Sequence, residues 1–503
     1  MSAGTGADGI RHRGLRFEEQ LIFEQHADGR TGVDLPEPPA VADRLGGLAR
    51  AAPIGLPGLS EPQVVRHFTR LSQKNYAIDS GLYPLGSCTM KHNPRLNEKL
   101  ARLPGFADIH PLQPQSTVQG ALALMDRLAG WLRALTGMPA IALSPAAGAH
   151  GEWTGLMTIR SAHEAAGDAR KRVLVPDSAH GTNPASAAMC GYEVAAVPLN
   201  ARGRVDLAAL KSALDGDVAA FMLTNPNTCG LFEDEILEQA GAVREAGAYF
   251  YSDGANFNAI VGRVRPGDLG IDCMHLNLHK TFSTPHGGGG PGSGPIALSE
   301  ALAPFAPVPY VVGGPDGFRL VEHDGGAAFG RVKRFHGQMG MFVRALAYIL
   351  SHGIDGLRQA SSDAVLNANY VSAGLADLMS LPYDGPCMHE VLFDDAFLKD
   401  TGVSTLDLAK AMIDEGYHPA TIYFPLVVHG ALLLEPTETE SRESLDHLVA
   451  TLRGIVRRAL AGEADAFHAA PAHAPRRRFD ETAAARRPVL RWRPPGAEDQ
   501  AAE

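Results

Sequence analysis

Long apolar runs are missing from this sequence. No segment approaches the roughly 20 consecutive apolar residues that are needed to cross a membrane. The first residues, Met1 to Gly14, are polar and lack the apolar segment of a secretory signal. We therefore expect a soluble, cytoplasmic protein with no membrane partner.

Cysteine is also scarce. The five cysteines are scattered, odd in number and never spaced as Cys-x-x-Cys. Such a pattern argues against a disulfide framework or a zinc site, and it favours reduced thiols in a reducing compartment. We expect no metal site. The five residues are Cys88, Cys190, Cys229, Cys273 and Cys387.

An excess of positive charge is absent as well. The formal net charge of −11 gives no general basic field for nucleic acid. The arginine-rich end of the chain is an exception, but no aromatic stacking platform accompanies it. We interpret it as a solvated or partner-draping extension rather than a nucleic-acid arm. Its arginines are Arg476, Arg477, Arg478, Arg486, Arg487, Arg491 and Arg493.

The chain is long enough for two or three domains. It has 503 residues, and its hydrophobic and charged fractions are ordinary for a soluble globular protein. Changes in composition and pattern indicate four regions. These are an N-terminal arm (1–60), a large domain (61–340), a small C-terminal domain (341–465) and a tail rich in Arg, Ala and Pro (466–503).

Strand and helix patterns alternate through the large domain. The residues Thr117 to Thr136 form an amphipathic pattern that ends at Gly137 and predicts a helix. The alternation after it indicates an α/β fold with a mostly parallel sheet, which places ligands at the carboxyl ends of the strands. Strands are expected at 140–143, 173–175, 194–199, 218–223, 248–251 and 273–278, and helices up to about 164, at 206–214 and at 233–246.

The small domain has a mixed pattern. A helix at 341–352 is expected to link it to the large domain, and the segments after it predict an α+β arrangement. The expected helices are 360–379 and 441–460, and the expected strands lie near 391–393 and 431–434.

Two segments at strand ends are suited to binding an anion and a flat ring. Ser144 to Glu152 is a small-residue turn into a helix, whose unpaired N–H groups can seat a phosphate, although a plain turn is equally compatible. This turn matches neither the P-loop nor the dinucleotide motif. In Asp177 to Ser186, His180 can stack on a ring or donate a hydrogen bond, although a lone His is more often structural.

Two further strand ends carry polar groups. Thr224 and Asn227 lie in a segment dense in amides and hydroxyls, which an Asx turn would also explain. Asp253 ends an apolar strand and is followed by Gly and Ala255. A buried carboxylate needs a cation, and a protonated ring nitrogen would supply one.

Lys280 follows the strand predicted at 273–278 and precedes the glycine-rich run Gly287 to Gly294. Lysine forms Schiff bases with carbonyl cofactors, and glycine lets backbone approach a ligand closely. A surface lysine before a flexible loop is the plain alternative. His279 and a desolvated, glycine-walled site would favour the neutral amine.

The order of these pieces predicts the cofactor. A phosphate turn, a polar His, an Asp and then a Lys are the parts that pyridoxal 5'-phosphate requires. Lys280 would bind its aldehyde, Asp253 would keep the ring nitrogen protonated, and the helix N-terminus would bind the phosphate.

Several long strings then resemble the P-proteins of the glycine cleavage system, the glycine dehydrogenases (decarboxylating). The resemblance spans about residues 60–445, although Phe335-His336-Gly-Gln departs from the Phe-Tyr-Gly-Asn expected there. The strings that carry it begin at Leu71 (LSQKNY), Tyr83 (YPLGSCTMKHNP), Asp177 (DSAHGTNPA), Leu223 (LTNPNT), Asn277 (NLHKTF) and Glu435 (EPTETE).

This resemblance implies a fold type I pyridoxal-phosphate enzyme, similar to aspartate aminotransferase. The family has a single-chain form of roughly twice this length and a two-chain form in which only subunit 2 holds the cofactor lysine. A chain of this length with Lys280 therefore implies subunit 2, in a heterodimer or a dimer of heterodimers with subunit 1. The implied substrates are glycine and the lipoyl group of H-protein. Catalytic residues would be Lys280, Asp253 and His180, with His180 and Ala255 against the two ring faces. Gly148 and Ala149 would bind the phosphate, and Thr224, Asn227 and His279 would complete the cofactor site.

Two other readings remain open. One is a different fold type I reaction, such as that of an aminotransferase or a cysteine desulfurase. The other is a non-catalytic subunit that only binds a partner, against which Lys280 argues.

Overall fold

The structure is a computed structural model that describes residues 19–33, 35–36, 39–42, 44–52, 54–287, 291–323, 326–474 and 476–492. Contacts between residues divide the chain into two compact units. One is Ala77–Ala464, and the other combines Met1–Tyr76 with Asp465–Glu503. Part of the expected N-terminal arm (1–18), the middle of the glycine run (288–290) and Arg493 lie outside the described residues. The four region boundaries remain predictions.

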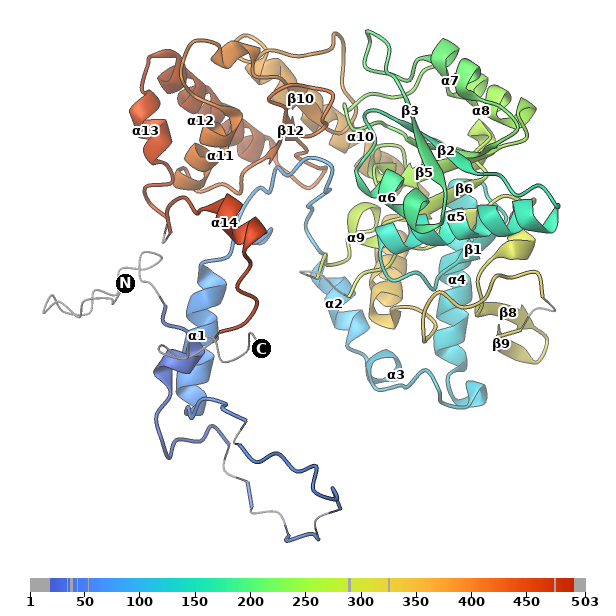
Figure 1. Ribbon diagram of the computed structural model, residues 1–503, viewed down its shortest axis with the longest axis horizontal. Coiled ribbons are helices and arrows are strands. Elements are labelled where there is room, and N and C mark those ends of the chain that lie inside the picture. Colours follow the sequence, from blue (N-terminus) through green and yellow to red (C-terminus); the bar gives the residue numbers. More distant parts are fainter. Residues whose placement is uncertain are drawn as a thin grey trace, which may run out of the picture. The chain divides into compact units, whose positions relative to one another are not determined.

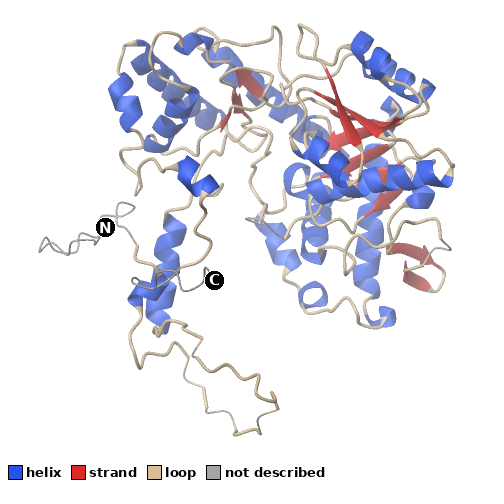
Figure 2. Ribbon diagram, viewed as in Figure 1, coloured by secondary structure: helices blue, strands red, loops and turns tan. Residues whose placement is uncertain are grey.

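Seven strands form the main sheet of the larger unit, in the order β1-β7-β6-β5-β4-β2-β3; Figure 2 shows the strands in red. Neighbouring strands pair in parallel except where β7 takes part, because β7 runs antiparallel to both β1 and β6. The mostly parallel α/β sheet is therefore confirmed. Its strands are β1 (Ala140–Ala142), β2 (Arg172–Pro176), β3 (Glu193–Val197), β4 (Val218–Thr224), β5 (Tyr249–Gly254), β6 (Cys273–Leu276) and β7 (Ile296–Leu298).

Helices cover both faces of this sheet (Figure 1). Successive side chains of a strand point to opposite faces. Phe221 of the fully buried β4 packs in one core with α4 (Gln119–Thr136) and α8 (Ile236–Glu245). Met222 packs on the other face with α5 (Gly148–Ala165) and α6 (Thr182–Met189). Both faces are apolar, as a buried parallel sheet requires.

The long element α10 (Met339–Leu375) runs from this part of the unit toward a second, smaller sheet. Two helices were predicted here, and the structure joins them across a kink at Gly353, which has φ 62°. Glycine adopts that backbone conformation without the cost of a Cβ. The smaller sheet is antiparallel, in the order β10 (Val391–Phe393), β12 (Leu432–Leu434), β11 (Thr421–Ile422).

The strand predicted to end at Leu278 is two residues shorter. β6 stops at Leu276, and Lys280 lies on the four-residue helix α9 (Leu278–Thr281). The N–H of Lys280 donates to the Asn277 carbonyl at 3.0 Å, so the backbone bonds within its own turn instead of to a neighbouring strand. The predicted strand end at Leu278 was wrong, and the turn of helix that carries Lys280 was not predicted.

Several elements were not predicted, among them α6, β7, α11 and the hairpin of β8 and β9. The remaining elements are α2 (Arg95–Ala101), α3 (Pro104–Ala107), α7 (Leu207–Ala213), β8 (Tyr310–Gly314), β9 (Gly317–Val321), α11 (Thr405–Asp414), α12 (Arg442–Leu460) and α13 (Ala464–Ala469). No helix among the described residues is both long and apolar enough to span a bilayer. All five cysteines are described, and none forms a disulfide.

The smaller unit is built on α1 (Glu61–Gln73) and includes α14 (Glu481–Arg486). Glu19 accepts hydrogen bonds from the Arg70 guanidinium at 2.5 and 2.6 Å. Phe23 stacks on Trp492, with ring centroids 4.8 Å apart. Residues of the expected arm and tail therefore pack together in this unit.

Candidate active site

A cavity of about 290 Å³ opens at the carboxyl ends of β4, β5 and β6, beside the N-terminus of α5. Of the nine predicted site residues, eight line it, and Asn227 does not. The predicted residues that line it are Gly148, Ala149, His180, Thr224, Asp253, Ala255, His279 and Lys280.

Lys280 presents its amine to this cavity. Its Nζ donates a hydrogen bond to the backbone carbonyl of Ser87 at 2.6 Å. Ser87 and its neighbour Cys88 also line the cavity, and both belong to the string beginning at Tyr83 that carries the family resemblance. This loop, from a distant part of the chain, therefore closes one side of the site.

Asp253 lies near the end of β5 and is buried. Its Oδ2 accepts a hydrogen bond from Asn183 Nδ2 at 3.0 Å, and its Oδ1 accepts one from the Ala255 N–H at 2.8 Å. Burial alone would raise the pKa of this carboxyl, but His275, Asn183 and the Ala255 N–H outweigh it and lower the pKa. Asp253 is therefore held as a carboxylate, ready to accept a hydrogen bond from a cationic group.

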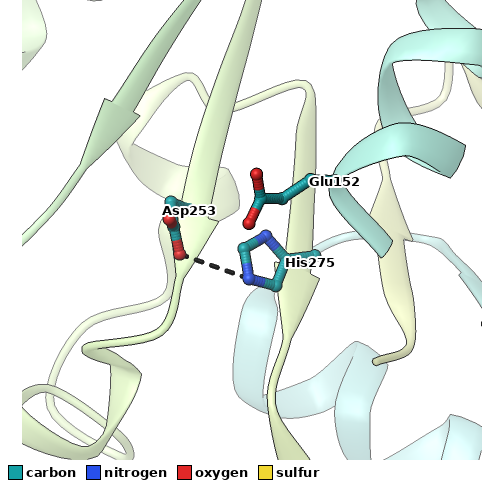
Figure 3. A group of neighbouring side chains, drawn as sticks. All are labelled: Glu152, Asp253 and His275. Carbon is teal, nitrogen blue, oxygen red and sulfur yellow. Dashed lines mark ion pairs between the residues drawn. The ribbon is translucent and has the colours of Figure 1, made fainter. Parts of the chain in front are cut away.

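Asp253 forms a group of three buried side chains with His275 and Glu152 (Figure 3). The β5–β6 register places His275 beside Asp253, with Nε2 3.2 Å from Oδ1. His275 Nδ1 lies 2.7 Å from the Tyr251 hydroxyl, so both ring nitrogens have partners. His275 was not among the predicted site residues, although it shares a strand face with Cys273 two positions before it.

The third member, Glu152, comes from α5 and is also buried. It accepts hydrogen bonds from Thr182 at 2.8 Å, Asn183 at 3.0 Å and Ser186 at 3.3 Å. Burial, and next the charge of Asp253, raise its pKa. Ligand atoms of Glu152, Asp253 and His275 lie within 4.8 Å of one another, a spacing that a metal ion could also use. Because each of these atoms already has a protein partner, the group is suited to orienting Asp253.

The N-terminus of α5 is open to an anion. No side chain caps its first turn, and Gly148 and Ala149 both line the cavity. A Cβ on Gly148 would collide with the Asn277 amide, so only glycine allows this close approach. Unpaired N–H groups and the helix dipole favour a phosphate at this position.

Four buried polar atoms on the cavity wall have no hydrogen-bond partner among the described residues. They are Thr224 Oγ1, Asn256 Oδ1, Asn277 Oδ1 and His279 Nδ1. Buried polar groups are rarely left unpaired, so these atoms indicate a polar ligand. Burial, with nearby His286 and Lys280, lowers the pKa of His279 to about 3, so the ring is neutral. An amine, a buried carboxylate, an anion seat and unpaired polar atoms together fit pyridoxal phosphate.

His180 lies on the exposed side of the cavity. Its Nδ1 is 2.8 Å from Thr182 Oγ1, and its ring meets Phe424 edge-on, with centroids 5.5 Å apart. Ala255 lines the same cavity. Stacking of His180 and Ala255 on the two faces of a ring stays a prediction.

Asn227 lies outside the cavity lining and is used in a turn. Its Nδ2 donates to the Gly203 carbonyl and to Glu233, each at 2.9 Å, and its Oδ1 accepts from the Cys229 N–H at 3.0 Å. The Asx-turn alternative therefore describes its surroundings better. We leave Asn227 out of the proposed cofactor site.

The described end of the glycine run packs against the phosphate turn. A Cβ on Gly294 would collide with the Ala147 carbonyl, and one on Gly292 would lie 3.1 Å from the Ala146 carbonyl. These two glycines allow backbone to pack directly on the turn before α5. His336, in the string that departs from the resemblance, lies outside this cavity, with Nε2 3.0 Å from the Pro111 carbonyl.

The chain matches known proteins over nearly all of its length. A Caulobacter vibrioides protein called probable glycine dehydrogenase (decarboxylating) subunit 2 is 67% identical over 498 residues, covering 98% of this chain and 95% of that protein. A Listeria monocytogenes protein of the same name is 50% identical over 478 residues, covering 94% of this chain and 98% of that protein. Residues 360–475 also match the family described as "Glycine dehydrogenase, C-terminal domain".

Solved structures share the fold. The crystal structure of glycine decarboxylase (P-protein) of the glycine cleavage system, in inhibitor-bound form, matches with a TM-score of 0.70 at 22% identity, covering 82% of this chain and 93% of that one. A structure of C-DES with glycine covalently linked to its PLP cofactor matches with a TM-score of 0.58 at 16% identity, covering 74% and 96%. The fold class is confirmed as fold type I. On the identity to its sequence relatives, the chain belongs to the family of glycine dehydrogenase (decarboxylating) subunit 2.

Proposed function

We propose that this chain catalyses the pyridoxal-phosphate-dependent decarboxylation of glycine and transfers the remaining aminomethyl group to the lipoyl group of H-protein. The observation that carries the proposal is one cavity shared by the Lys280 amine, the Asp253 carboxylate and the N-terminus of α5. Membership of the family supports the same activity.

The residues divide the binding of the cofactor among them. Lys280 would hold its aldehyde carbon, and Gly148 and Ala149 would bind its phosphate through backbone N–H groups. Thr224 and His279 would donate or accept hydrogen bonds with the atoms that now lack partners. When bound, pyridoxal phosphate supplies an electron-accepting ring that stabilises the negative charge left on the glycine α-carbon as CO₂ departs.

Asp253 would keep a proton on the ring nitrogen. A carboxylate with a lowered pKa does not take that proton itself, and the salt bridge would compensate both buried charges. His275 and Asn183 fix the orientation of the carboxylate through contacts at 3.2 and 3.0 Å. His180 and Ala255 would hold the ring plane from its two sides.

No arginine is found among the described residues that line the cavity. A bidentate arginine would stabilise the charged ground state and oppose loss of CO₂. A cavity wall of hydroxyls, amides and neutral His279 binds a carboxylate less strongly. This composition suits decarboxylation better than a reaction that must retain the carboxylate.

The assembly belongs to the proposal. Subunit 1 would join this chain in a heterodimer or a dimer of heterodimers, H-protein would deliver the lipoyl group, and the reaction would take place in the cytoplasm. The relatives' name, subunit 2, supports a partner subunit.

The test is isotope exchange. This chain, mixed with its partner subunit, pyridoxal phosphate and lipoyl H-protein, should exchange labelled CO₂ into the carboxyl of glycine. Omitting H-protein should reduce the exchange strongly. Transamination or release of sulfide without any glycine-dependent exchange would favour an aminotransferase or a desulfurase and overturn the proposal.

A further inference from the structure

Two glutamates outside the cavity lining are fully buried behind the Ser87–Thr89 loop. Glu390 directly precedes β10, and Glu435 directly follows β12. The antiparallel register pairs Val391 with Leu434, so the two glutamates are neighbours at one end of the ladder. Ligand atoms of both, and of His389, lie within 4.8 Å of one another.

Two carboxylates this close cannot both be charged in a buried site. Neither glutamate has a lysine or arginine ion-pair partner among the residues that the structure describes. Burial, and next the charge of Glu435, raise the pKa of Glu390 well above its usual range. Burial beside a second carboxylate therefore favours a protonated, neutral Glu390.

Both glutamates hold the backbone of the loop. Glu390 Oε2 accepts a hydrogen bond from the Ser87 N–H at 2.7 Å, and Glu435 Oε2 accepts one from the Thr89 N–H at 2.9 Å. Ser87 and Thr89 have φ of 61° and 45°, a left-handed conformation that costs free energy for residues other than glycine. Such a conformation persists only where surrounding contacts hold it. The hydrogen bonds from Ser87 to Glu390 and from Thr89 to Glu435 provide those contacts.

The held loop reaches the reactive amine. The Ser87 carbonyl accepts the hydrogen bond from Lys280 Nζ, and Cys88 lines the cavity between the two clamped residues. We propose that Glu390 and Glu435 are positioning residues that clamp the Ser87–Thr89 loop, so that the Ser87 carbonyl orients the Lys280 amine. This inference rests on the proposed function of Lys280.

His389 lies beside the two glutamates. Its ring is fully buried, its Nε2 is 3.8 Å from Glu435 Oε1, and neither ring nitrogen has a hydrogen-bond partner among the described residues. Burial lowers the pKa of this ring. Lys280 acts electrostatically on Glu390 and His389, and Glu438 acts on His389. Burial, and also the charge of Glu390, raise the pKa of the nearby thiols of Cys88, Cys229 and Cys387.

The test compares Glu390→Gln and Glu390→Ala with the matched control Glu233→Ala. Glu233 is also buried with a raised pKa, and it accepts bonds from Asn227, Gln239 and the Val205 N–H away from the cavity. Glutamine at 390 can still accept from Ser87 and donate to Glu435. It should therefore preserve the loop, whereas alanine should release it.

Two measurements distinguish a role of Glu390 in positioning the loop from a role in the stability of the fold. In cofactor-free protein with its partner subunit, amide hydrogen exchange at Ser87 and Thr89 should rise at least about tenfold in Glu390→Ala and stay unchanged in Glu233→Ala. In the loaded enzyme, Glu390→Ala should lower kcat/KM about 10- to 100-fold and move the pH midpoint of the visible cofactor absorbance. Glu390→Gln should stay within about threefold of wild type.

Two results would overturn the clamp. One is equal loss of thermal stability in both alanine variants, with loop exchange and the absorbance midpoint unmoved. The other is one divalent cation per chain in the isolated protein that disappears in Glu390→Gln. Absence of any cofactor absorbance in the wild type would instead defeat the proposed function, and the exchange readout would still decide the clamp.

Discussion

His275 and Asp253 lie side by side across β5 and β6, with Nε2 3.2 Å from Oδ1, and both side chains are buried. The imidazole thus lies between the Tyr251 hydroxyl and the carboxylate that would face the cofactor ring. The contact depends on the parallel register of β5 and β6, because a shift of one residue would turn His275 to the other face of the sheet.

Replacing His275 by Ala should lower kcat by about 10- to 100-fold, because Asp253 loses the partner that orients it. Steady-state kinetics with saturating glycine would measure this. His163→Ala is the control, since His163 is also buried and bonds the Ala219 carbonyl at 3.1 Å away from the cavity. Equal losses of kcat in the two variants would contradict a specific role for His275.

Replacing Asp253 by Asn should lower turnover by about 100-fold or more, because an amide cannot keep the ring nitrogen protonated. The visible absorbance of the loaded enzyme should also change. Asp272→Asn is the control, since Asp272 accepts from the Phe250 N–H at the opposite end of β5. If Asp253→Asn retained full turnover and an unchanged spectrum, Asp253 would not face the ring.

Replacing Gly148 by Ala should weaken cofactor binding about tenfold or more, because the added Cβ collides with the Asn277 amide at the phosphate seat. Equilibrium titration with pyridoxal phosphate would measure the dissociation constant. Gly454→Ala in α12 places its Cβ in open space, so it should stabilise the fold by about 0.5–1 kcal/mol without changing affinity. Unchanged affinity in Gly148→Ala would remove this turn from the phosphate site.

Acid should destabilise the protein through His279 and His286. Burial, with neighbouring charges, lowers their pKa values to about 3 and about 4 from the usual 6.5. The unfolded chain therefore binds these protons first, so the stability is complete above pH 6.5 and falls as the pH drops toward 4. Between pH 7.5 and 5, Tm should fall further in wild type than in the His279→Gln/His286→Gln double variant. An equal fall in both proteins would contradict this account.

Sequence pattern predicted the sheet because strand and helix periods differ clearly. It predicted α4, whose leucines face one core and whose last turn ends at Gly137, and the apolar β4. It missed α6, where Asn183-Pro184 resembles a turn, and it extended the strand before Lys280 to Leu278 because apolar residues continue past the last ladder bond. The local sequence pattern does not show where the hydrogen bonds to neighbouring strands end.

The local pattern could single out residues that lie at the ends of their own strands, as Asp253 and Thr224 do. Its supporting contacts were missed because they depend on long-range packing. Glu152 reaches Asp253 from the second turn of a helix, and Glu390 meets Glu435 only through the register of β10 and β12. In the sequence around Glu152, Glu390 and Glu435, nothing distinguishes these side chains from solvated ones.

The central claim is that Lys280 is the residue that binds the cofactor. The most direct measurement is borohydride reduction of the loaded protein, followed by intact mass and peptide mapping. The account predicts one added cofactor per chain, on Lys280, and none in Lys280→Ala, which should also lose the visible absorbance and turnover. A cofactor mapped to another lysine, or a Lys280→Ala protein that still turns over, would contradict it.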